Sequence, residues 1–300
     1  MASLPLVPED DGPLLAISDL QVSFGSVEVV RGISLLLHRG EVLGLVGESG
    51  SGKSVTSLAV LGLLDKAARV KGSIRWQGRE LVGLADGDLR SIRGREIAMI
   101  FQEPMTALNP VMTIGRQVSE AIRAHGNRTS GALAKQQAIE ALEAVAIPEA
   151  TRRYNDFPHQ FSGGQRQRIL IAMALVHKPQ LLIADEPTTA LDVTVQAQVL
   201  ELMKNLQREH GLAMLFTSHD LAIVGKMADQ VVVMRQGQVL ESGPVRTVLT
   251  APHHPYTQSL LDAVPTLRTD RNRPLSTLSA EEPITLGTLV ESEPGHWVRL

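Results

Sequence analysis

Alternating apolar and polar positions dominate the first hundred residues and indicate β-strands. β-branched residues at every second position suit a pleated surface with one buried face. The predicted strands cover residues 16–24, 27–37, 41–46 and 97–102. We also expect a hairpin over residues 73–81 that turns at Gln77-Gly78. A glycine-rich loop follows the third strand, and the apolar stretch after it, residues 55–64, favours a helix.

The spacing becomes helical after residue 105. Ile139, Leu142 and Val145 recur every three residues in an Ala-, Gln- and Glu-rich stretch, which predicts a helical insertion over about residues 105–165. Helices then alternate with strands. The helices are predicted at 164–177 and 194–209, the strands at 181–184 and 213–217, and a hairpin turning at Gln236-Gly237 at 230–240. This alternation predicts an α/β fold whose mostly parallel sheet is covered on both faces.

The two ends of the chain differ in composition from its middle. Residues 1–13 are acidic and contain proline, so we expect a flexible lead. Repeated prolines in residues 251–300 interrupt long elements and predict an irregular C-terminal extension. The main domain is expected to cover residues 14–250.

Composition narrows the class of protein. A hydrophobic fraction of 43% and a charged fraction of 20% are typical of a globular chain with a sizeable core. The net charge of −3 argues against nucleic acid as a partner. The absence of cysteine excludes disulfides, thiolate metal sites and iron–sulfur clusters. No segment has the roughly 18 consecutive apolar residues of a membrane span, and the N-terminus lacks a secretory pattern. We therefore expect a soluble chain whose membrane role depends on partners.

Residues 47–54 (GESGSGKS) fit the phosphate-loop pattern G-x-x-x-x-G-K-[ST] between a predicted strand and a predicted helix. Glycines let successive backbone N–H groups point at phosphate oxygens, and the helix N-terminus adds partial positive charge. A flexible turn is the alternative, but the strand–helix context favours a phosphate site. Lys53 would reach the β- and γ-phosphates, and the Ser54 hydroxyl would ligate Mg²⁺. The predicted binding residues are Gly47, Ser49, Gly50, Ser51, Gly52, Lys53 and Ser54.

Two carboxylates, Asp185 and Glu186, end the apolar strand at 181–184. Ligands bind beyond the carboxyl ends of parallel strands. Asp185 suits Mg²⁺, and Glu186 is placed to polarise an attacking water. By itself this pattern is also compatible with a solvated acidic turn. Beside a phosphate loop it indicates a nucleoside triphosphatase.

Phe161-Ser162-Gly163-Gly164-Gln165 opens a predicted helix and closely resembles the LSGGQ signature of ATP-binding cassette (ABC) proteins, with phenylalanine where leucine is usual. A helix cap with glycines would explain this segment alone, but not the ordered set of motifs. The resemblance covers about residues 16–250. It implies a P-loop NTPase core with a mixed sheet, an antiparallel β subdomain and a helical insertion. It also implies that Ser162, Gly163, Gly164 and Gln165 bind the ATP of a neighbouring subunit.

Further positions match this family. Phe24 matches the aromatic that stacks on adenine, although a core role is the alternative. Gln102 matches the Q-loop glutamine that touches Mg²⁺ and senses the membrane subunit. Ala190-Leu191-Asp192 matches the D-loop at the dimer interface. His219 matches the switch histidine that orients Glu186. The resemblance thus implies catalytic roles for Gln102, Glu186 and His219, and Mg²⁺ ligation by Ser54, Gln102 and Asp185.

Residues 101–110 (FQEPMTALNP) and 254–265 (HPYTQSLLDAVP) resemble the peptide and nickel importer subfamily. That subfamily carries dipeptides, oligopeptides, nickel or metallophore complexes, and glutathione. Many members bind a four-iron cluster through cysteines of the extension, which this chain lacks. The adjacent His253 and His254 are more typical of solvated side chains than of a metal site.

The resemblance implies an ATPase that energises solute import and uses ATP and Mg²⁺. Its partners would be a second ABC ATPase subunit (often a different but similar chain), two transmembrane permease subunits and, indirectly, an extracytoplasmic solute-binding protein. The chain would lie peripherally on the cytoplasmic face of the inner (plasma) membrane. A soluble ABC-type ATPase acting on DNA or ribosomes is the alternative. Such proteins usually carry two cassettes or long insertions, which disfavours it here.

Overall fold

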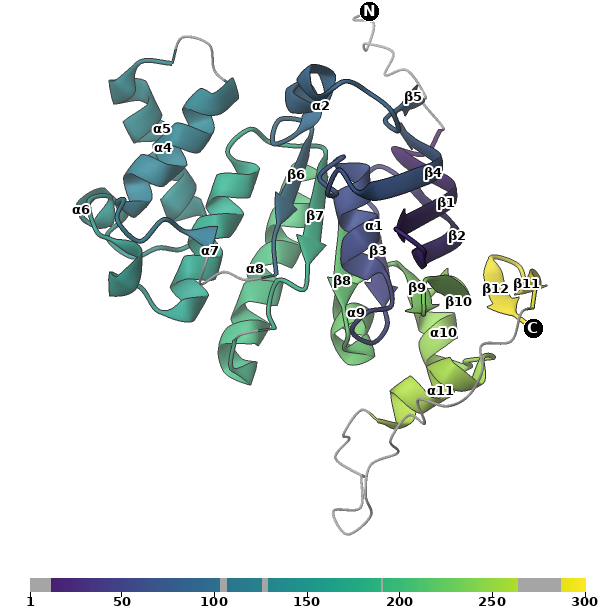
Figure 1. Ribbon diagram of the computed structural model, residues 1–300. Coiled ribbons are helices and arrows are strands. Elements are labelled where there is room, and N and C mark those ends of the chain that lie inside the picture. Colours follow the sequence, from purple (N-terminus) through teal and green to yellow (C-terminus); the bar gives the residue numbers. More distant parts are fainter. Residues whose placement is uncertain (1–11, 103–106, 126–128, 190, 264–286) are drawn as a thin grey trace, which may run out of the picture.

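Figure 1 shows the computed structural model, which describes residues 12–102, 107–125, 129–189, 191–263 and 287–300. Its N-terminal part is a four-stranded antiparallel sheet in the order β2-β1-β4-β5. The strands are β1 (Leu15–Phe24), β2 (Val27–Leu37), β4 (Ala68–Trp76) and β5 (Arg79–Glu80). The predicted hairpin at Gln77-Gly78 is β4–β5. The antiparallel subdomain is therefore confirmed.

The central sheet is mixed and has eight strands in the order β11-β12-β10-β9-β3-β8-β7-β6. Neighbours from β9 to β6 run parallel, whereas β9, β10, β12 and β11 pair antiparallel. The strands are β3 (Val42–Val46), β6 (Ile97–Ile100), β7 (Leu181–Asp185), β8 (Ala213–Ser218), β9 (Gln230–Arg235), β10 (Gln238–Pro244), β11 (Leu289–Glu293) and β12 (His296–Arg299). The expected α/β fold is confirmed, and the parallel half holds the predicted site.

Two apolar cores lie on the two faces of this sheet. In β7, Leu182 and Ala184 belong to one core, and Leu181 and Ile183 to the other. Strands buried on both faces appear in the sequence as continuous apolar runs. Helix α1 (Lys53–Val60) contacts β2, β7 and β8, so it lies between the two sheets.

Helices α8 (Val193–His210) and α9 (Leu221–Met227) pack on the other core. The predicted apolar face of α8 points into this core and consists of Val195, Val199, Leu202 and Leu206. Helix α2 (Asp86–Ile92) precedes β6.

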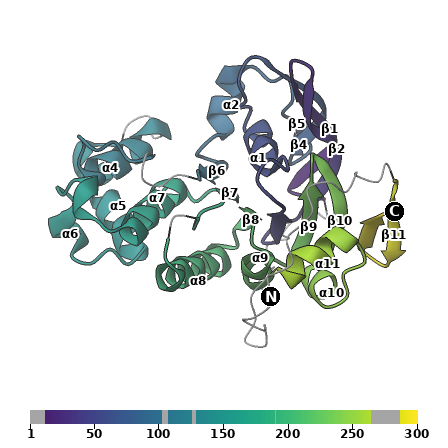
Figure 2. The same cartoon turned by 60° about the horizontal axis from the view of Figure 1, so that its bottom comes forward.

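The predicted helical insertion forms a lobe beside the sheet (Figures 1 and 2). Its helices are α4 (Ile114–His125), α5 (Gly131–Ala144), α6 (Ala150–Arg153) and α7 (Gly163–Leu175), with the 3-10 turn Pro158–Gln160 before α7. Leu142 and Val145 are fully buried, as their spacing predicts. Helix α7 contacts α4 and α5 as well as β6 and α8, so it joins the lobe to the sheet.

The C-terminal extension is more regular than expected. Helix α10 (Val245–Thr250) leads into it, and its described residues form α11 (Pro255–Asp262) and the β11–β12 pair. Pro255 occupies the first turn of α11, where its missing N–H is tolerated. Pro294 lies between β11 and β12. The expectation of an irregular tail is thus wrong for these residues, because the prolines fall at element ends. The predicted lead at 1–13 lies almost wholly outside the described residues.

Candidate active site

The glycine-rich loop connects β3 to α1 at the carboxyl ends of the parallel strands, as the motif predicts. Gly52 has a φ of 102°, in the left-handed region that favours glycine. Gly47 lies against β9, where a Cβ atom would be 2.1 Å from the Met234 carbonyl oxygen. Both glycines are therefore required by the path of the loop.

Lys53 is the buried cation of this loop. Its side chain is 3% exposed. Its Nζ donates to the carbonyl oxygens of Gly47 at 2.7 Å and Glu48 at 3.0 Å. Nζ also lies 3.6 Å from Glu186 Oε1. Burial lowers the pKa of Lys53, and the nearby Glu186 and Asp185 carboxylates oppose that shift. A cation removed from water interacts strongly with anions, because little solvent screens it.

Ser54 and Asp185 place two oxygen atoms side by side. Ser54 Oγ donates to Asp185 Oδ1 at 3.1 Å, and Thr217 Oγ1 donates to the same atom at 2.6 Å. The parallel register sets Asp185 of β7 opposite Thr217 of β8. The structure thus brings together the serine of the loop and the carboxylate of the distant strand.

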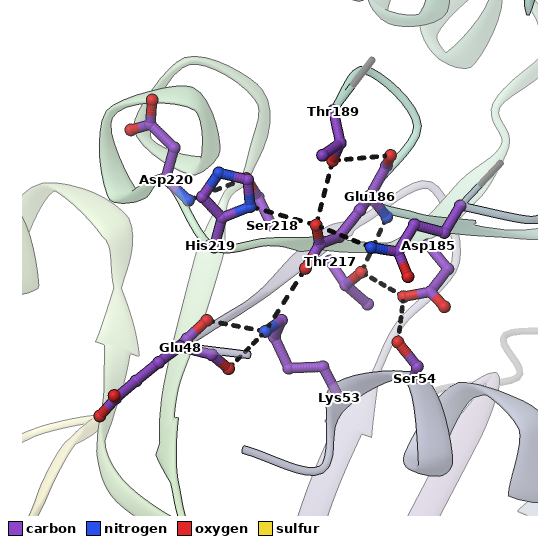
Figure 3. A network of polar contacts seen from close by, with 12 residues as sticks. Glu48, Lys53, Ser54, Asp185, Glu186, Thr189, Thr217, Ser218, His219 and Asp220 are labelled. Carbon is purple, nitrogen blue, oxygen red and sulfur yellow. Dashed lines mark hydrogen bonds and ion pairs between the residues drawn. The ribbon is translucent and has the colours of Figure 1, made fainter. Parts of the chain in front are cut away.

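Glu186 is the centre of a polar network (Figure 3). Its Oε2 accepts hydrogen bonds from Gln102 Nε2 at 3.4 Å and Thr189 Oγ1 at 3.0 Å, and lies 3.1 Å from His219 Nδ1. Its φ of 44° is unusual for a residue other than glycine. Its N–H donates to the Thr217 hydroxyl at 3.0 Å, which holds this turn. The three predicted catalytic residues therefore meet at one carboxylate.

The electrostatic surroundings keep Glu186 ionised. Burial raises its pKa, but hydrogen bonds from His219 and Thr189 and the charge of Lys53 outweigh burial, so the pKa lies below its ordinary value. A depressed pKa in the folded state stabilises the fold above the ordinary glutamate pKa. That contribution is lost as the pH falls through the lowered pKa.

Thr189 and Thr217 were missed by the sequence analysis. Thr217 is completely buried near the end of the apolar strand β8 and hydrogen-bonds both Asp185 and the Glu186 backbone. A hydroxyl inside an apolar strand is the signal that could have identified it. Thr189 follows Glu186 by three residues, and its local sequence carries no comparable signal.

The residues present fit a nucleotide phosphate and a magnesium ion. Loop residues line a pocket of about 120 Å³ together with Gln102 and Glu186. Inside the loop, Ser51 Oγ is buried and has no hydrogen-bond partner among the described residues, although buried polar atoms normally have one. Ser54 and Asp185 supply the hard oxygen ligands that Mg²⁺ prefers, and Mg²⁺ usually completes its shell with water and substrate phosphates.

The Ser162–Gln165 turn starts α7 in the helical lobe, and α7 lies apart from α1, which begins at Lys53 (Figures 1 and 2). Ser162 Oγ accepts from the Gln165 N–H at 3.3 Å, and Gln165 Oε1 accepts from the Ser162 N–H at 3.1 Å. This reciprocal capping box fixes the first turn of α7. Within one chain, the structure does not bring the turn to Lys53.

The two glycines of this turn have different surroundings. A Cβ at Gly164 would lie 2.2 Å from Val195 Cγ1, so the contact between α7 and α8 requires glycine. A Cβ at Gly163 would lie 3.5 Å from Leu191 Cδ2, an ordinary contact. Packing against the described residues therefore does not explain Gly163.

Phe24 and Asp192 have structural roles within the chain. Phe24 ends β1 and packs, partly buried, against the core between the two sheets. Asp192 caps α8, because its Oδ1 accepts from the Val195 N–H at 2.9 Å. Stacking of Phe24 on adenine and an interface role for Asp192 therefore stay predictions. Ala190, the first residue of the predicted D-loop, lies outside the described residues.

A family model described as "ABC transporter" matches residues 30–189, which include both the phosphate loop and Glu186. The chain belongs to the ABC transporter family. A second model, "Oligopeptide/dipeptide transporter, C-terminal region", matches residues 240–289 of this ABC protein. The family and the subfamily indicated by the motifs are thus confirmed.

Curated relatives are similar over most of the ABC protein. The oligopeptide transport ATP-binding protein OppD of Bacillus subtilis is 48% identical, over 90% of this chain and 77% of that protein. A putative peptide import ATP-binding protein of Brucella abortus is 50% identical, over 87% of this chain and 80% of that protein. The glutathione import ATP-binding protein GsiA of Salmonella choleraesuis is 47% identical, over 97% of this chain and 50% of that protein.

Solved ABC structures share the fold. CbiO1 from Clostridium perfringens, part of an ABC transporter complex, has a TM-score of 0.69 at 27% identity, covering 80% of this chain and 92% of that one. The dimeric cassette MJ0796, bound to ADP and Pi, has a TM-score of 0.67 at 28% identity, covering 77% of this chain and 99% of that one. These neighbours confirm the fold class and the ATPase class.

These comparisons give no support to the alternative of an ATPase acting on DNA or ribosomes. In the part of the chain that the structure describes, the helices are too short or too polar to cross a bilayer.

Proposed function

We propose that this ABC protein hydrolyses ATP to energise the import of peptides or related small solutes. One observation carries the proposal: Gln102, His219 and Lys53 converge on the Glu186 carboxylate beside the phosphate loop. The match of residues 240–289 to the oligopeptide/dipeptide transporter C-terminal region supports the class of solute. The names of the relatives favour dipeptides, oligopeptides or glutathione, and the subfamily resemblance adds nickel or metallophore complexes.

In this proposal the loop of residues 47–54 binds the phosphates of ATP. The Lys53 ammonium keeps its hydrogen bond to the Gly47 carbonyl oxygen and donates its remaining N–H groups to the β- and γ-phosphate oxygens. The N-terminus of α1 adds its partial charge. The Ser51 hydroxyl gains a hydrogen-bond partner, which it lacks among the described residues. Phe24 stacks on the adenine.

Glu186 orients and deprotonates the attacking water in the proposed mechanism. Its lowered pKa keeps it in the carboxylate form, and Gln102 and His219 hold its Oε2 in place. Ser54, Asp185 and Gln102 would hold Mg²⁺. When bound, Mg²⁺ neutralises charge on the β- and γ-phosphates.

A second cassette completes the site in this proposal. Ser162, Gly163, Gly164 and Gln165 of one subunit would contact the γ-phosphate bound to the other. Two features support this. Helix α7, which begins at the turn, lies apart from α1, which begins at Lys53 (Figures 1 and 2). The described residues leave room at Gly163, where a phosphate could approach the backbone N–H. Closure would then depend on ATP, because the nucleotide bridges the two subunits.

The partners in this proposal are a second, similar ATPase subunit and two transmembrane permease subunits. A solute-binding protein on the other side of the membrane would select the solute. The ABC protein would lie on the cytoplasmic face of the inner (plasma) membrane, and the helical lobe, joined to the site through Gln102, would contact the permeases.

Reconstitution with the permease chains in vesicles tests this function. We expect the protein to co-purify with two permease chains, and a peptide-loaded binding protein to stimulate ATP hydrolysis.

Lys53→Ala should abolish ATP binding measured by calorimetry, because it removes the buried cation of the loop. The exposed Lys66→Ala is the matched control and should bind normally. Undiminished binding by Lys53→Ala would refute the phosphate-loop assignment.

A further inference from the structure

Helix α11 of the C-terminal extension reaches the phosphate loop. Tyr256, in the first turn of α11, is 3% exposed. Its hydroxyl accepts a hydrogen bond from the Glu48 N–H at 3.3 Å. We propose that Tyr256 is a positioning residue for the phosphate loop, through which the C-terminal extension sets the affinity for ATP. This inference rests on the ATP-binding function proposed above.

The hydrogen bond acts on one rigid peptide group. The Glu48 N–H belongs to the trans peptide that joins Gly47 to Glu48. The carbonyl of the same peptide, on Gly47, accepts from Lys53 Nζ at 2.7 Å. A trans peptide is planar, and its N–H and C=O point in opposite directions. Tyr256 and Lys53 therefore hold the same plane from its two sides, so loss of the Tyr256 hydroxyl would free the carbonyl that orients Lys53.

Arg235, at the end of β9, strengthens this contact. Its guanidinium lies over the Tyr256 ring, 4.9 Å from the ring centroid. Its Nε is 3.3 Å from Glu48 Oε1, and its side chain is only 8% exposed. Cation–π contacts of this kind gain strength when the cation is desolvated. Burial also raises the pKa of Tyr256, so its hydroxyl stays neutral. The ring is thus fixed by the arginine that also holds the side chain of Glu48.

The start of α11 is anchored in the central sheet. Glu241 of β10 is completely buried. Its carboxylate accepts from the His253 N–H at 2.8 Å and the His254 N–H at 3.1 Å, and lies 2.7 Å from His296 Nε2 of β12. His254 Nδ1 in turn accepts from the Tyr256 N–H at 3.0 Å. The sheet therefore fixes where Tyr256 stands, and the extension can act as a firm support for the loop.

The test compares the only two tyrosines of the chain. Tyr256→Phe removes only the hydroxyl that holds Glu48. Tyr154→Phe is the matched control, because the Tyr154 hydroxyl makes an equivalent hydrogen bond to Ser119 Oγ at 2.8 Å in the helical lobe. One hydrogen bond corresponds to about a three- to tenfold change in an equilibrium. We expect Tyr256→Phe to weaken ATP binding and raise KM by that factor, with kcat maintained, and Tyr154→Phe to leave KM unchanged.

The split between KM and kcat separates positioning from a merely structural role. A loss of folded protein would lower the apparent kcat and leave KM unchanged. A displaced loop instead weakens the binding of ATP equally in the ground state and in the transition state, which raises KM and leaves kcat unchanged. The inference is overturned if Tyr256→Phe keeps the wild-type dissociation constant for ATP, or if Tyr154→Phe weakens binding equally. If the wild-type protein binds no ATP, or if Lys53→Ala binds it normally, the proposed function fails instead.

Discussion

At the scale of single residues, Lys53 and Glu186 form the pair around which the site is built. The ammonium and the carboxylate lie 3.6 Å apart, and both side chains are at most 10% exposed. Each is also held by uncharged groups, the loop carbonyls for Lys53 and Thr189 for Glu186. Because each keeps partners besides the other, the two charges can separate around a phosphate without either being left unpaired.

Replacing Glu186 with glutamine should abolish turnover while preserving ATP binding. The amide has the same shape but cannot accept a proton, so we expect hydrolysis to fall by at least about a hundredfold. The exposed Glu209→Gln on α8 is the matched control. Phosphate release and calorimetric titration with ATP would measure the two effects. Near-normal hydrolysis by Glu186→Gln would mean that another group activates the water.

Most residues of the site could be predicted because they belong to contiguous motifs. The phosphate loop lies within eight residues, and Asp185 and Glu186 directly follow an apolar run. Thr217 could not be found in this way, because its role depends on the register between β7 and β8. Tyr256 is similar, since its contact with Glu48 spans 208 residues of sequence.

At the scale of elements, the first two residues of α7 are glycines with different surroundings. Val195 of α8 leaves no space for a side chain at Gly164, whereas Gly163 has room. The capping box between Ser162 and Gln165 satisfies two groups of the first turn. The same short segment therefore serves the packing of the lobe and, in our proposal, a second subunit.

Alanine substitutions should separate these two roles. Gly164→Ala should destabilise the fold by roughly 1–3 kcal/mol, the usual cost of overpacking. Gly163→Ala should leave the free energy of unfolding nearly unchanged but impair hydrolysis by the assembled transporter. Urea denaturation of both variants measures the first effect, and steady-state ATPase activity the second. Equal destabilisation by the two variants would contradict the packing argument.

The periodicity of apolar residues predicted the elements well where it is local. Strands β1 and β2 and the face of α8 follow directly from it, whereas β4 begins at Ala68, before the predicted hairpin. The β11–β12 pair was not predicted, because prolines nearby suggested irregular structure. Its place beside β10 depends on pairing between residues more than 50 positions apart, such as Glu241 and Val298. No local pattern encodes such a contact.

At the scale of the whole molecule, our proposal assigns parts of two ATP sites to one chain. Its phosphate loop joins β3 of the central sheet to α1, and Glu186 follows β7. Ser162 caps α7, which belongs to the helical lobe (Figure 1). In our proposal two cassettes meet head to tail, so that each supplies the part of the site that the other lacks. The C-terminal extension belongs to the first part, because α11 contacts the loop.

Hydrolysis by the transporter assembled with Ser162→Arg tests this two-cassette account most directly. Ser130→Arg is the matched control, because Ser130 caps α5 in the same lobe and its hydroxyl accepts from the Leu133 N–H at 3.3 Å. Loss of a cap costs each variant about 1 kcal/mol, so any stability effect is shared. The account predicts that Ser162→Arg binds ATP normally at its own loop, while the hydrolysis that depends on its turn falls by about a hundredfold or more, and that Ser130→Arg stays active. Full hydrolysis by the Ser162→Arg complex would contradict it.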